Sequence, residues 1–166
     1  AFRPINMISS SLYQVFFQRT SEQVNRCESI MPFFKKYLLR TTLLILPLFI
    51  VLFFFLPDLT EWLLGKDWGQ TGDYICIMLP WLAMSILVAP ICYLSDVFFQ
   101  QKKGFLFEIA LIIARLLGIG LGIFYHDFFL SIVGFCIGSA VVIFFQLIWY
   151  LSLILNYEKN RTKRLL

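Results

Sequence analysis

Arg115 has the most informative position in this sequence, because it stands near the middle of the apolar stretch Gly104–Tyr125. A charge at the centre of a bilayer costs at least about 2.5–3.5 kcal/mol on insertion scales, so an arginine there normally faces a protein partner or a water-filled cavity. Its planar guanidinium fits phosphate and carboxylate oxygens. We therefore expect Arg115 to bind an anionic headgroup that passes through the membrane. The alternatives are an intramembrane ion pair and a clamp on helix carbonyls.

Two carboxylates stand at a similar predicted depth on either side of one turn. Asp96 is near the end of one apolar stretch, and Glu108 is near the start of the next. Neighbouring negative charges favour the uptake of a proton or a cation. The pair is therefore a hypothesis for a coupling-ion or proton site. The plainer interpretation is that both carboxylates reach the membrane interface or pair with Lys102 and Lys103.

Few residues of the sequence are arranged for catalysis or for holding a metal. The single histidine, His126, precedes Asp127 at a predicted turn, where capping is a commoner role than catalysis. The cysteines, which form no Cys-x-x-Cys pair, are Cys27, Cys76, Cys92 and Cys136. P-loop, nucleophile-elbow and zinc-protease motifs are missing from the sequence. We therefore expect no metal site and no cofactor, and we do not expect an enzyme.

Four apolar stretches must position these residues, and each is long enough to cross about 30 Å of hydrocarbon as a helix. They are Tyr37–Leu56, Tyr74–Phe99, Gly104–Tyr125 and Phe128–Leu155. The chain is 60% hydrophobic and 14% charged, which is more apolar surface than a soluble domain of 166 residues can bury. Long runs without alternation favour helices over barrel strands, so the sequence predicts an all-α integral membrane protein with four transmembrane helices.

Basic residues occur in the connecting segments on one predicted side of the membrane. They are Arg19, Arg26, Lys35, Lys36, Arg40, Lys102, Lys103, Lys159, Arg161, Lys163 and Arg164. The opposite side has Lys66 alone. By the positive-inside rule, the first group and the C-terminus are cytoplasmic. Membrane lipid accounts for the net charge of +4, so we do not expect nucleic acid as a partner.

The composition divides the chain into four parts. Residues 1–18 look like the end of a truncated membrane helix, and we infer that the chain is the C-terminal portion of a longer protein. Residues 19–36 form a cytoplasmic linker, for which an amphipathic helix on the membrane surface and a plain solvated segment are equally good interpretations. Residues 37–155 hold the four membrane helices, and residues 156–166 form a basic cytoplasmic tail.

Two kinds of small or rigid residue should shape the membrane helices. Pro80 and Pro90 each remove a helix hydrogen bond, so the second stretch should be kinked and could act as a hinge. Pairs of glycines spaced four apart allow helix backbones to approach closely, so the third and fourth helices should pack against each other or a neighbour. These pairs are Gly118/Gly122 and Gly134/Gly138.

Three parts of the chain resemble segments of one known family. Pro4-Ile5 followed by SSLYQVFFQR at 10–19 is similar to the segment that closes the eighth helix of bacterial polysaccharide-biosynthesis flippases, which export O-antigen and capsule repeat units. LLGKDWGQTGDY at 63–74 resembles an outer-loop signature of these proteins. LPW at 79–81, AP at 89–90 and QQK at 100–102 are similar to their tenth helix. The likeness extends over nearly the whole chain.

This resemblance implies a larger molecule. The family belongs to the multidrug/oligosaccharidyl-lipid/polysaccharide exporter superfamily, with twelve or more helices in two six-helix lobes that rock around a central cationic cavity. The implied substrate is an undecaprenyl-pyrophosphate-linked oligosaccharide, flipped from the cytoplasmic to the periplasmic leaflet of the bacterial inner membrane by alternating access. The chain would hold helices nine to twelve, with the missing N-terminal helices as its partner. The matching motifs do not include Arg115, whose expected role rests on its place in the membrane.

Two other functions remain open from the sequence. A membrane enzyme acting on prenyl-phosphate-linked sugars would need clustered acidic or histidine side chains at an interface, whereas the outer acids here are dispersed. These acids are Asp58, Glu61, Asp67 and Asp73. A non-catalytic membrane scaffold subunit would give Arg115 no role beyond packing.

Overall fold

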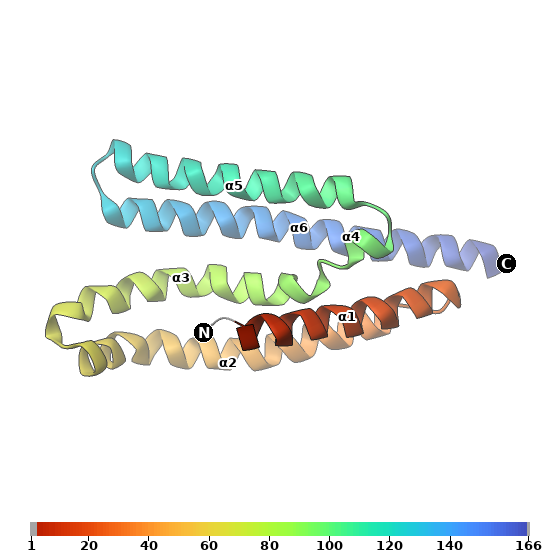
Figure 1. Ribbon diagram of the computed structural model, residues 1–166, viewed down its shortest axis with the longest axis horizontal. Helices are drawn as coiled ribbons and strands as arrows, with labels where there is room; N and C mark the ends of the chain where they lie inside the picture. The colour runs from red at the N-terminus through yellow and green to blue at the C-terminus, as the bar shows by residue number, and fades with distance from the viewer. Residues whose placement is uncertain (1–2, 166) are drawn as a thin grey trace.

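The computed structural model describes residues 3–165 and the side chains of residues 14–163, and the described chain is helical apart from short turns (Figure 1). The helices are α1 (Arg3–Asn25), α2 (Met31–Leu64), the 3-10 turn η1 (Lys66–Trp68), α3 (Gly69–Val88), the 3-10 turn η2 (Ala89–Ile91), α4 (Leu94–Val97), α5 (Gln101–Phe124) and α6 (Phe128–Leu165). Four segments are long and apolar enough to cross a membrane. The predicted all-α, multi-pass membrane architecture is confirmed at this level.

The long helices form two hairpins packed side by side. α5 lies along α6, α2 lies along α3, and α3 joins the hairpins by packing on α6 (Figure 1). α1 lies against the first part of α2, where the ring of Phe16 contacts those of Phe33 and Tyr37. The α1–α2 turn, α4 and the C-terminal part of α6 all lie at one end of the molecule (Figure 1). We call this the basic end, because Lys102, Lys103 and the other connecting-segment cations except Lys66 belong to it.

Small residues bring α5 and α6 into direct backbone contact, as the glycine spacing predicts. A Cβ atom added at Gly118 would collide with the backbone of Gly134. A Cβ atom at Gly138 would lie 3.0 Å from the carbonyl oxygen of Ala114. By contrast, a Cβ atom at Gly120 would meet nothing within 4 Å, so this glycine faces away from the contact. Close approach without side chains in between is how membrane helices gain packing energy.

The connecting segments differ from the expected division of the chain. Residues 20–25 continue α1, and the turn to α2 occupies only residues 26–30, so neither a separate amphipathic helix nor a long solvated linker spans 19–36. The buried Thr20 hydroxyl donates a hydrogen bond to the Tyr93 hydroxyl at 3.0 Å and ties this part of α1 to the core. Residues 156–165 extend α6 rather than forming a separate tail. The expectation that residues 1–18 are the end of a truncated membrane helix concerns a segment that is only partly described. The structure describes its backbone from residue 3 and its side chains from residue 14.

The two prolines of the second apolar stretch have different surroundings. α3 runs through Pro80 without interruption, whereas Pro90 lies in η2, where the α-helix has already ended at Val88. The predicted single helix over Tyr74–Phe99 is therefore divided, because Pro90 has no N–H with which to continue the ladder. The Tyr37 hydroxyl donates to the Leu87 carbonyl oxygen at 3.2 Å, which supports the chain just before the break. Movement at either proline stays a prediction.

Candidate membrane-embedded arginine site

Arg115 projects from the middle of α5 onto α6, where a buried hydroxyl receives it. Its Nε donates a hydrogen bond to Ser139 Oγ at 3.2 Å, and Ser139 is fully buried. The contact is made possible by the neighbouring residues Ala114 and Gly138, which hold the two helices together. The close packing of α5 on α6 at these small residues therefore also brings the Arg115 side chain within hydrogen-bond distance of Ser139.

Two aromatic rings complete the surroundings of the guanidinium group. Its central carbon lies 5.3 Å from the ring centroid of Phe135 on α6 and 5.6 Å from that of Trp81 on α3. The two rings meet edge to face with their centroids 5.1 Å apart. A cation within about 6 Å of an aromatic centroid is attracted by the ring quadrupole, and tryptophan is the best such partner. Arg115 therefore connects α5 to α3 across α6.

Among residues 14–163, the charge of Arg115 has no acidic counterpart within ion-pair distance. The ion pair that these residues do form joins Arg161 to Glu158 at the basic end. The intramembrane ion pair considered above is therefore not formed within the described part of the chain. Arg115 is only half-buried, so part of the side chain remains accessible to a group from outside the chain.

The Trp81 side chain has a polar atom without a partner. Its indole Nε1 is buried and has no hydrogen-bond partner among the described atoms. Buried donors are nearly always paired in folded proteins. This unpaired donor belongs to the same side chain whose ring faces the Arg115 guanidinium group.

The predicted carboxylate pair occupies a different place, near the basic end. Asp96 in α4 is half-buried and is not without an interaction partner. Glu108 on α5 is exposed. Both lie close enough to Tyr150 to act on it electrostatically. Tyr150 is almost fully buried, and its hydroxyl oxygen accepts a hydrogen bond from Gln146 Nε2 at 3.4 Å. The structure therefore brings the two carboxylates into one neighbourhood and adds Tyr150 and Gln146, which sequence reasoning did not connect with them.

This neighbourhood does not form a recognisable metal centre. Within the part of the chain that the structure describes, no three histidine, cysteine or acidic side chains are grouped so as to hold a metal ion. The cysteines are all reduced and are dispersed over α3, α6 and the turns. A proton or cation role for Asp96 and Glu108 stays a hypothesis.

Glu158 forms a contact that the sequence gave no reason to expect. Its Oε1 accepts hydrogen bonds from Ser29 Oγ at 2.8 Å, from the Ile30 N–H at 2.8 Å and from the Met31 N–H at 3.1 Å. Nearby, the Tyr157 hydroxyl donates to the Glu28 carbonyl oxygen at 3.1 Å. A carboxylate on the free N–H groups at the start of α2 is favoured by the helix dipole. The end of α6 is thereby fastened to the α1–α2 turn.

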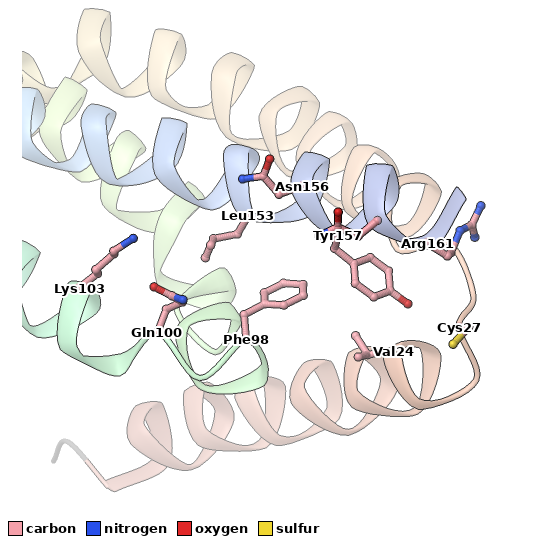
Figure 2. A pocket seen from close by; sticks show the side chains of 10 residues that line it. Val24, Cys27, Phe98, Gln100, Lys103, Leu153, Asn156, Tyr157 and Arg161 are labelled. Carbon is pink, nitrogen blue, oxygen red and sulfur yellow. The ribbon is translucent and has the colours of Figure 1, made fainter. Parts of the chain in front are cut away.

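A pocket of about 510 Å³ lies beside this contact at the basic end (Figure 2). It is enclosed by the end of α1, the turn between α4 and α5, and the extension of α6. Its lining residues are Val24, Cys27, Phe98, Gln100, Lys103, Leu153, Asn156, Tyr157, Asn160 and Arg161. We refer to it as the basic-end pocket. Sequence reasoning missed it because the α6 extension, which supplies four of the ten lining residues, was expected to be a separate tail.

Comparisons with family models, with curated proteins and with solved structures give no match to this chain.

Proposed function

We propose that the chain is part of a transporter that flips an undecaprenyl-pyrophosphate-linked oligosaccharide across the bacterial inner membrane. The observation that carries the proposal is Arg115, a half-buried cation in the middle of a membrane-length helix without a carboxylate partner among the described residues. A permanent charge in that position calls for a function, because it is costly to insert. A pyrophosphate presents oxygens that suit the guanidinium fork.

The surroundings of Arg115 are consistent with such a substrate. The Trp81 and Phe135 rings offer apolar surface to a prenyl chain beside the guanidinium group. Binding would be reversible, because Ser139 and the two rings hold the arginine when the substrate has left. An acidic partner would compete with the phosphate, and none of the described carboxylates pairs with Arg115, which favours an anionic ligand over the scaffold alternative.

The arrangement of helices also supports transport. A row of α5, α6, α3 and α2 offers only one wall for a substrate path, so we propose that further helices of the same transporter supply the opposite wall. The helix break at Pro90 lies between the two hairpins and provides a place where they could pivot during alternating access. By the charge pattern, the basic end and the C-terminus face the cytoplasm.

Deletion of the gene tests this function. The lipid-linked oligosaccharide should accumulate in the inner membrane while the mature surface polysaccharide disappears, because synthesis continues without export. A plasmid copy of the complete gene should restore export, and a copy that encodes only residues 1–166 should not. Unchanged surface polysaccharide and no accumulation of the lipid-linked precursor in the deletion strain would rule the proposal out.

A further inference from the structure

We propose that the basic-end pocket binds the phosphate-containing headgroup of an anionic phospholipid. This site is separate from Arg115 and does not depend on which substrate the protein transports. The pocket is formed by three segments distant in the sequence, so a bound lipid would join the end of α1, the α4–α5 turn and the α6 extension. Its volume of about 510 Å³ is within the range typical of small-molecule sites.

The charges that line the pocket select an anion. Lys103 and Arg161 are its two charged lining residues, and neither aspartate nor glutamate is among the described side chains of the wall. Glu158, which follows Tyr157 in the sequence, accepts hydrogen bonds through Oε1 from two backbone N–H groups of α2 and from Ser29. Its Oε2 lies 3.4 Å from Arg161 Nε. This ion pair partly neutralises Arg161, so the anion preference of the pocket depends mainly on Lys103.

Two donors of the pocket lie near one another at the start of α5. Figure 2 shows Lys103 and Gln100 there, with Phe98 and Tyr157 farther toward the α1–α2 turn. The Lys103 ammonium and the Gln100 side-chain amide supply donors for phosphate oxygens. Arg161 lies at the far end of the pocket, where it forms an ion pair with Glu158.

The apolar part of the wall favours a lipid over free phosphate. The ring centroids of Phe98 and Tyr157 lie 5.7 Å apart. The apolar side chains of Val24 and Leu153 also line the pocket. Inorganic phosphate would leave this surface uncovered, whereas the glycerol and ester region of a phospholipid would fill it. Basic pockets between membrane helices on the cytoplasmic side are typical sites for acidic headgroups. We therefore assign the pocket to a phosphatidylglycerol-type lipid.

Native mass spectrometry of the complete protein, released from nanodiscs that contain phosphatidylglycerol and phosphatidylcholine, tests the proposal. Lys103→Gln should lower the retention of phosphatidylglycerol about fivefold, because each lysine near an anionic surface contributes about that factor. Lys102→Gln is the matched control, since it removes the same charge from the adjacent residue, which does not line the pocket. It should change retention less than twofold. Both lysines are exposed, so neither change should disturb folding.

Three results would overturn the assignment. Equal losses in the two variants would indicate general attraction to the membrane rather than this pocket. Equal retention of phosphatidylcholine and phosphatidylglycerol by the unaltered protein would remove the anionic preference. Displacement of the lipid by millimolar sodium phosphate would assign the pocket to soluble phosphate instead. A further variant, Leu153→Trp, fills the pocket without changing charge and should reduce phosphatidylglycerol retention as much as Lys103→Gln does.

Discussion

Arg115 is accommodated in α5 by contacts that do not neutralise it. Ser139 supplies one hydroxyl oxygen, and the Trp81 and Phe135 rings supply diffuse negative potential. None of these groups carries a formal charge, so the site keeps a net positive charge. Under the proposed function, an arginine held in this way is positioned in advance for the anionic substrate, so that little rearrangement is needed on binding.

Substitution of Arg115 should separate binding from folding. Arg115→Ala should lower export at least about tenfold at normal protein abundance, because a hydrogen bond to a charged group contributes about 1.5–3 kcal/mol. Arg115→Lys should retain part of the activity, since it keeps the charge but loses the bidentate fork. Export is measured beside the amount of membrane-inserted protein, with Lys66→Ala as a control for the loss of a distant charge. Normal export by Arg115→Gln at normal abundance would contradict the binding role.

The position of Arg115 in the middle of a membrane-length helix could be predicted from the sequence, but its neighbours could not. Its depth follows from counting residues along one apolar stretch. Trp81 and Ser139 lie on other helices, and one sequence does not specify which faces of those helices meet. The same limit applies to Tyr150, which is buried beside Gln146 although its place near the end of an apolar stretch gives no sign of this.

At the scale of the helices, direct backbone contact between α5 and α6 should make one glycine irreplaceable. Gly118→Ala should lower the free energy of unfolding by about 1–3 kcal/mol, because the added methyl group collides with the Gly134 backbone. Gly120→Ala should be neutral or stabilising by up to about 1 kcal/mol, since it meets nothing and alanine favours a helix. The free energies of unfolding of the two variants are measured by denaturation in detergent. Equal values would show that α5 and α6 are not in direct backbone contact at Gly118.

The contact of Glu158 with the start of α2 should hold the end of α6 in place. Glu158→Ala should lower the free energy of unfolding by about 1–3 kcal/mol, because the Ile30 and Met31 N–H groups lose their acceptor. Trypsin should then cut faster after Arg26 in the exposed turn. Glu22→Ala, an exposed acid on α1, is the matched control and should leave both stability and cleavage unchanged. If cleavage in the Glu158→Ala variant stays slow, the contact of Glu158 with the start of α2 is not needed to hold the α1–α2 turn in place.

The presence of the helices was predictable, whereas several of their ends were not. Runs of apolar residues identify membrane segments because lipid requires both length and a satisfied backbone. The end of α6 differs from the prediction, since hydrophobicity stops near Leu155 while helical hydrogen bonding continues to Leu165. What stabilises this extension is contact with Ser29 and Ile30, and no local pattern records contacts between residues so far apart.

At the scale of the whole molecule, the charge pattern predicts the orientation in the membrane. The structure places η1 and the α5–α6 turn opposite the basic end (Figure 1). In a variant without native cysteines, Asp67→Cys should react with a membrane-impermeant maleimide from outside intact cells. Lys102→Cys should react only after the cells are opened, because its segment faces the cytoplasm by the positive-inside rule. Labelling of Lys102→Cys in intact cells would reverse the orientation.

Translocation in proteoliposomes tests the central claim most directly. The complete protein is reconstituted with a fluorescent undecaprenyl-pyrophosphate-linked oligosaccharide, and the fraction that reaches the opposite leaflet is followed by its accessibility to a membrane-impermeant quencher. We predict translocation by the unaltered protein, and at most about a tenth of that rate for Arg115→Gln inserted to the same level. Equal rates for the two proteins, or no translocation above protein-free vesicles, would contradict the account.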